Sequence, residues 1–80
     1  MKAEKIAEEI RKEADRLRSI LISALYKADR LETLATIRNF SQSTGELIEE
    51  LETDLKECYN TILEIGAYYN ILLDFKEGDA

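Results

Sequence analysis

A chain of 80 residues with a 45% hydrophobic share is long enough for one domain, but too short to bury a large core by itself. Its formal net charge of −6, without His and without a stripe of cations, argues against a nucleic-acid partner. Purely apolar runs such as Ile20–Ile22 are far shorter than the roughly 20 residues that span a membrane, so we expect no membrane partner. The single Cys58 excludes an intrachain disulfide and predicts a reducing, cytoplasmic location.

The first half of the chain predicts one long helix over residues 2–39. Small and apolar residues recur there at alternating spacings of three and four, which places them along one side of a helix. In the row that repeats every seven residues from Ala7 to Ala35, four of the five residues are Ala. Because small side chains allow close approach, we expect this row to face the partner helix, with Ile6, Ile20 and Leu34 widening the apolar side. The full pattern is Ala3, Ala7, Ile10, Ala14, Leu17, Leu21, Ala24, Ala28, Leu31 and Ala35.

A polar cluster at residues 39–45 predicts the turn of the hairpin, which we place at residues 40–43. Asn39 is expected to end the first helix in a left-handed conformation. Ser43, followed three residues later by Glu46, matches a capping box, so the second helix is expected to start at residue 44.

The second half predicts a helix over residues 44–76, followed by a frayed tail at residues 77–80. A short turn between two long helices favours an antiparallel hairpin, so the expected fold is all-α, with one coiled-coil-like domain over residues 1–80. The apolar stripe of this helix consists of Ile48, Leu51, Leu55, Cys58, Ile62, Ile65, Tyr69 and Leu72.

More apolar surface is present than one hairpin can bury. The segment Ile20–Tyr26 is apolar nearly all round, and a helix of that kind is normally covered on every side. A second copy of the chain is the simplest cover and would give a four-helix bundle with two-fold symmetry, whereas a larger protein partner is the alternative. The C-terminal aromatics are either core or recognition surface. The candidate interface residues are Ile20, Ile22, Leu25, Tyr26, Tyr59, Leu63, Tyr68 and Phe75.

The charges are unevenly divided, at +2 for residues 1–40 and −8 for residues 41–80. In an antiparallel pairing, the acidic residues from Glu46 to Glu57 lie level with Lys27, Arg30 and Arg38. We expect ion pairs across the hairpin. Such pairs favour the antiparallel pairing over parallel ones but contribute little to the stability of the fold.

Residues for catalysis are sparse. Without His there is no His-based triad, and Cys58 falls on the apolar stripe, as expected for a buried inert thiol. The acidic run Glu46–Asp54 is similar, over a few residues, to the glutamate pairs of helical nucleotide pyrophosphohydrolases of the MazG type. By the heptad count, however, Glu49 and Glu50 face outward and no second inward acidic pair follows. We therefore expect no enzymatic activity, no catalytic residues, no metal and no cofactor.

These patterns predict a small protein–protein interaction module, acting as adaptor, chaperone or regulator, that works as a homo-oligomeric bundle. The alternative prediction, based on the net charge of −8 in residues 41–80, is an acidic nucleic-acid mimic that blocks a basic groove of a DNA- or RNA-binding protein. A remote alternative is a carboxylate-metal helical hydrolase. The short acidic chain is typical of phage or microbial accessory proteins.

Overall fold

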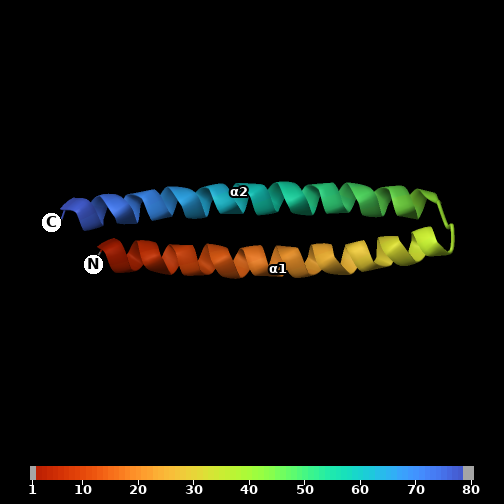
Figure 1. Ribbon diagram of the computed structural model, residues 1–80, viewed down its shortest axis with the longest axis horizontal. Coiled ribbons are helices and arrows are strands. Elements are labelled where there is room, and N and C mark those ends of the chain that lie inside the picture. The colour runs from red at the N-terminus through yellow and green to blue at the C-terminus, as the bar shows by residue number, and fades with distance from the viewer. Residues whose placement is uncertain (1, 79–80) are drawn as a thin grey trace.

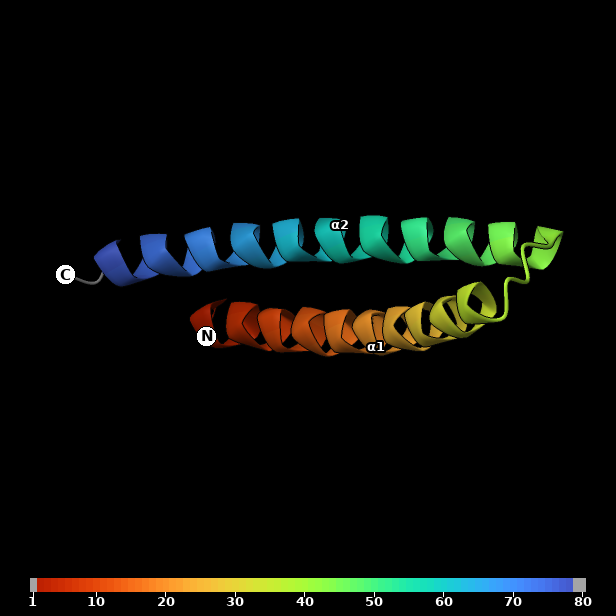
Figure 2. The same ribbon diagram turned by 45° about the vertical axis from the view of Figure 1, so that its right-hand side comes forward.

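The computed structural model describes the chain from residue 2 to residue 78, with side chains to residue 75, and within that range it contains two α-helices. Helix α1 spans Lys2–Thr36 and helix α2 spans Gln42–Gly78. The helices lie side by side and run in opposite directions, so both chain ends lie at the end opposite the turn (Figure 1). The same arrangement is visible from a second direction (Figure 2). The hairpin measures 60 × 14 × 14 Å, and the predicted all-α hairpin is confirmed.

The helix boundaries differ from the predicted ones by a few residues. Helix α1 ends at Thr36 instead of residue 39, and α2 begins at Gln42 instead of residue 44. Helix α2 also continues to Gly78, so the first two residues of the predicted frayed tail are helical. The rest of that tail, residues 79–80, lies outside the described residues.

Helix α1 ends at a left-handed residue, but that residue is Arg38 and not the predicted Asn39. Arg38 has a φ of 55°, and its amide donates to the carbonyl of Ala35 at 3.1 Å. The amide of Asn39 donates to the carbonyl of Leu34 at 2.8 Å. These two bonds form a Schellman motif, in which the residue at the Arg38 position is usually Gly because a side chain is strained there.

Helix α2 starts earlier than the predicted cap because the turn itself supplies hydrogen-bond partners. The Ser41 carbonyl accepts the amides of Thr44 at 3.0 Å and Gly45 at 3.4 Å, so the first turn forms before Ser43. The Thr44 hydroxyl donates to the carbonyl of Asn39 at 2.8 Å, and Thr44 is only 5% exposed. A buried threonine therefore ties the end of one helix to the start of the next.

The two helices meet along a seam with a regular heptad spacing. Every seam residue is buried or half-buried, and each helix contributes two rows that repeat every seven residues. On α1 the seam consists of Ile6, Ile10, Glu13, Leu17, Ile20, Ala24, Lys27, Leu31 and Leu34. On α2 it consists of Thr44, Leu47, Leu51, Asp54, Cys58, Thr61, Ile65, Tyr68 and Leu72.

The structure corrects half of the predicted stripe on each helix. The rows that begin at Ile10 and Leu51 lie in the seam as predicted, and Cys58 is buried and free. The alanine-rich row from Ala7 to Ala35 is exposed, and the α1 seam is completed by the larger side chains of the row from Ile6 to Leu34. On α2 the row Ile48, Leu55, Ile62 and Tyr69 is exposed, and its place is taken by Leu47, Asp54, Thr61 and Tyr68.

Candidate interaction surface

Many of the apolar residues that lie outside the seam form a second stripe on each helix. In both helices this stripe consists of residues that directly follow seam residues, and its large apolar side chains remain 37% to 63% exposed. The charged residues Arg11, Arg18, Glu32 and Glu52 occupy positions in the same stripe. We call this surface the apolar face. Its apolar members are Ala7, Ala14, Leu21, Leu25, Ala28 and Ala35 on α1, and Ile48, Leu55, Tyr59, Ile62, Tyr69 and Leu73 on α2.

The two stripes lie on the same side of the hairpin. One residue along a right-handed α-helix turns the side chain by about 100°. Because α1 and α2 run in opposite directions, this turn is clockwise in one helix and anticlockwise in the other when both are viewed from the same end. Starting from a shared seam, both rotations point to the same side of the molecule, so the stripes join into one continuous face.

The opposite side of the hairpin is polar. It consists of the residues that directly precede seam residues, and we call it the polar face. On α1 it carries Lys5, Glu9, Lys12, Arg16, Ser19, Ser23, Tyr26, Arg30 and Thr33, and on α2 it carries Glu46, Glu50, Thr53, Glu57, Asn60, Glu64, Ala67 and Ile71. The hairpin as a whole is therefore amphipathic, because its two sides next to the seam are an apolar face and a polar face.

A polar cluster crosses the seam near its middle. The Lys27 ammonium donates to Asp54 Oδ2 at 2.8 Å, and the Ser23 hydroxyl approaches the same oxygen at 3.4 Å. The side chains of Lys27 and Asp54 are 26% and 14% exposed. The hydrogen bond to Asp54 raises the pKa of Lys27, although partial burial opposes the shift. This pair is one of the ion pairs expected across the hairpin, with Asp54 as the acidic partner.

A second charged residue in the seam, Glu13, is paired less closely. Glu13 Oε2 is buried without a hydrogen bond, and its contact with Arg16 Nη1 is 3.8 Å long. Burial, together with the neighbouring Glu64 carboxyl, raises the pKa of Glu13. The carboxylate of Glu13 is thus held where its charge is disfavoured.

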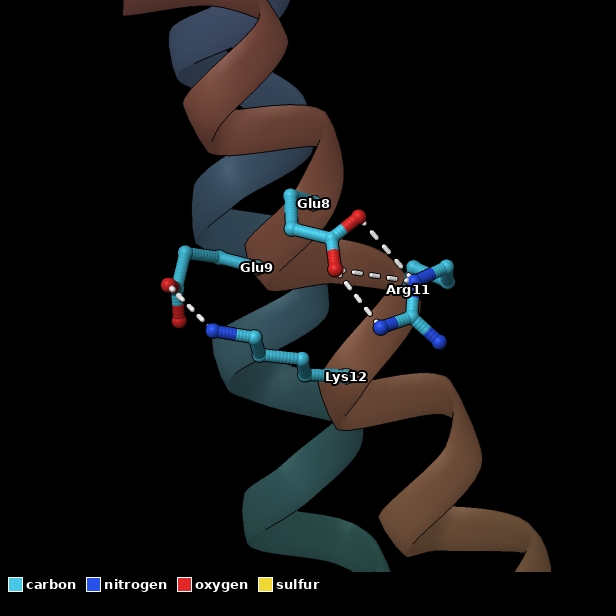
Figure 3. Close-up of polar contacts among 4 residues, drawn as sticks. All are labelled: Glu8, Glu9, Arg11 and Lys12. Carbon is cyan, nitrogen blue, oxygen red and sulfur yellow. Dashed lines mark hydrogen bonds and ion pairs between the residues drawn. The ribbon is translucent and has the colours of Figure 1, made fainter.

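Most of the described ion pairs lie along α1 and do not cross to α2. Arg11 donates to both carboxylate oxygens of Glu8, with Nη2–Oε1 at 2.6 Å, and Lys12 lies 3.6 Å from Glu9 (Figure 3). The hydrogen bond from Arg11 lowers the pKa of Glu8. Arg18 also pairs with the residue three before it, donating through Nη2 to one carboxylate oxygen of Asp15, Oδ1. Such exposed pairs, three residues apart, support a helix only weakly.

The eight candidate interface residues do not form one surface. Leu25 and Tyr59 lie on the apolar face, whereas Ile20 and Tyr68 are half-buried in the seam. Tyr26 belongs to the polar face. Ile22 and Leu63 are exposed on the outer sides of the helices, at 50% and 54%. Phe75 continues the seam row of Tyr68 toward the open end of the hairpin and is 36% exposed.

Sequence reasoning assigned most of the apolar face to the seam. Leu21, Leu55 and Ile62 were expected inside the hairpin, but each is about half exposed. The sequence feature that distinguishes these residues from seam residues is the pair of opposite charges, Lys27 and Asp54. These two residues satisfy each other only if their own rows face one another, and that choice turns Leu55 and Ile62 outward.

Among the side chains that the structure describes, those of residues 2–75, no group of three or more His, Cys, Asp or Glu is placed to hold a metal ion. Neither α1 nor α2, over the residues described, has a stretch long and apolar enough to cross a membrane. Comparisons with protein families, curated proteins and solved structures give no match.

Proposed function

We propose that this protein is a protein–protein interaction module that works by self-association through its apolar face. The observation that carries the proposal is the extent of that face, which leaves eight large apolar side chains exposed, two near the middle of α1 and six along α2. Contiguous apolar surface of this extent is typical of interfaces and is uncommon on a monomer. The presence of aromatic residues among them, Tyr59 and Tyr69, is in keeping with an interface.

The energetic scale supports association. Complete burial of a large apolar side chain contributes about 1.5–3 kcal/mol, so the exposed half of eight such residues amounts to about 6–12 kcal/mol per chain. A symmetric dimer doubles this gain. Association itself costs about 4–15 kcal/mol, so a dimer stable at micromolar concentration is within reach.

The same face explains how so short a chain becomes stable. Five seam residues are buried and not merely half-buried. They are the apolar residues Ala24, Leu47 and Cys58 and the polar residues Thr44 and Thr61. So small a core gives little stability to a chain of this size. Packing two hairpins face to face would create a second apolar layer, as in a four-helix bundle.

Two substitutions of the same kind on opposite faces test the proposal. Ile62→Glu places a carboxylate on the apolar face, where Ile62 is 53% exposed, and Ile71→Glu places one on the polar face, where Ile71 is 42% exposed. Both residues lie on α2, and circular dichroism would report whether each variant keeps its helices. Light scattering should show a dimer for the wild-type chain and for Ile71→Glu, and a monomer for Ile62→Glu. Equal masses for the two variants would contradict the proposal.

A further inference from the structure

We infer that the apolar face is covered by a second copy of this chain turned end for end, so that the two turns lie at opposite ends of the assembly. This inference rests on the proposed self-association and adds its geometry. It commits to a two-fold axis that crosses the apolar face level with Leu21 of α1 and the segment around Tyr59 of α2.

The first support is the palindromic order of residues on the α1 part of the face. Ala7 and Ala35 are equally distant from Leu21, and so are Ala14 and Ala28. When α1 packs against an antiparallel copy of itself about Leu21, small residues therefore meet small residues on both sides of the Leu21 pair, and the helices can approach closely there.

Two of the three charged residues on the α1 part, Arg11 and Glu32, follow the same order with opposite signs, whereas Arg18 has no charged counterpart after Leu21. Arg11 lies ten residues before Leu21 and Glu32 lies eleven residues after it. The end-for-end arrangement places Arg11 near the partner subunit's Glu32, and the symmetry repeats this pair at the other end. With both turns at the same end, each of these charges would be level with its own copy.

The α2 part of the face has an independent palindrome at the same level. Ile48, Leu55, Ile62 and Tyr69 are spaced by seven and are symmetric about the position between residues 58 and 59. The bonds of Asp54 to Lys27 and to Ser23 fix the register of the hairpin, and they place Leu21 level with residues 56–60 of α2. One axis therefore satisfies both helices, although their sequences are unrelated.

The net charge of the two halves of the hairpin points the same way. The turn half, residues 21–58, carries four Lys or Arg against eight Asp or Glu. The other half, residues 2–20 with 59–77, carries seven against eight. An end-for-end dimer keeps the two acidic halves apart, whereas a dimer with both turns at one end would place them side by side, which costs free energy through repulsion.

Distances between spin labels test the arrangement. In a Cys58→Ala background, Phe40→Cys puts a label on the turn, where Phe40 is 74% exposed. At 1.5 Å per residue the turn lies about 28 Å from the axis, so the two labels should be about 57 Å apart. With the turns together, they would lie within about 20 Å, given helix spacings of 8–10 Å.

A label at Ser19→Cys in the same background serves as the matched control. Ser19 is exposed on the polar face and lies close to the level of the axis, so its labels should be about 20–30 Å apart in either arrangement. A short Ser19 distance with a Phe40 distance near 57 Å supports the inference. Short distances at both sites would overturn the arrangement while leaving self-association intact. The loss of dipolar coupling at both sites would overturn the proposed function as well.

Discussion

The register of the seam can be tested by closing it with a disulfide. Ala24 and Cys58 are both buried between the helices, at 9% and 6% exposure, and lie about one turn from the pair of Lys27 and Asp54. Ala24→Cys should therefore form an intrachain bond with Cys58 on mild oxidation. The bond closes a loop of about 35 residues, for which the loss of chain entropy on unfolding corresponds to about 3–4 kcal/mol of stability. The melting temperature of the oxidised chain should rise by about 15–30 °C.

Leu25→Cys is the matched control, because residue 25 directly follows residue 24 and is 62% exposed on the apolar face. Its thiol points about 100° away from the seam and should not pair with Cys58 of the same chain. Thiol titration and mass spectrometry of the monomeric band after oxidation distinguish the outcomes, and thermal unfolding with and without reductant gives the magnitude. An intrachain bond in Leu25→Cys, with free thiols in Ala24→Cys, would refute the register.

Four further predictions follow from the described contacts. Glu13→Gln should stabilise the chain at neutral pH: the folded state raises the pKa of Glu13, so its contribution to stability falls as pH rises through that pKa, and the gain over wild type should vanish below about pH 4 in a series of denaturant titrations. Asp54→Ala leaves the Lys27 ammonium without its partner and should lower the melting temperature more than the joint replacement of Lys27 and Asp54 by Met and Leu, because the joint change strands no charge. Arg38→Gly should raise the free energy of unfolding by about 0.5–1 kcal/mol in urea titrations, since glycine adopts a φ of 55° without strain. Duplex DNA should show no salt-sensitive binding in fluorescence anisotropy, and submicromolar affinity that weakens steeply with salt would contradict this.

The hairpin could be predicted from the sequence because its determinants are local. Continuous heptads without Pro define two long helices, and the polar cluster from Asn39 to Gly45 is the natural place for the turn. The error at the turn concerns single residues. Arg38 occupies the left-handed position of the Schellman motif, which residue preferences assign to Gly or Asn. The earlier start of α2 depends on the hydrogen bond from the Thr44 hydroxyl to the Asn39 carbonyl.

The choice of seam could not be made from hydrophobicity. Each helix has one apolar row that lies in the seam as predicted, beginning at Ile10 in α1 and at Leu51 in α2. This row can form a stripe with the row on either side of it, and hydrophobicity alone does not show which of the two stripes is the seam. On α2 the more hydrophobic option contains Leu55 and Ile62, yet the seam contains Asp54 and Thr61. Asp54 is accepted there because Lys27 faces it, and Thr61 is accepted because its hydroxyl donates to the Glu57 carbonyl at 2.8 Å.

The presence of Asp54 and Thr61 in the seam, in place of Leu55 and Ile62, also determines which residues form the candidate interaction surface. The seam residues Thr44, Asp54 and Thr61 have hydrogen-bond partners within the hairpin, whereas Glu13 Oε2 has none. The apolar residues whose places in the seam are taken by polar ones form the exposed face. An interface variant chosen from the sequence alone, Ile22→Glu, would change a side chain that is 50% exposed on the outer side of α1. Ile62→Glu changes the centre of the apolar face and is the sharper test of association.

Small-angle X-ray scattering on an absolute scale shows whether two hairpins associate sideways along their whole length, because it reports both the mass and the longest dimension of the particle. A face-to-face dimer should have twice the chain mass of 9.2 kDa, while its longest dimension stays close to 60 Å. Scattering from the chain at 9.2 kDa, with a radius of gyration near 18.1 Å at every concentration, would contradict self-association. A doubled mass with a roughly doubled length would contradict the apolar face as its surface.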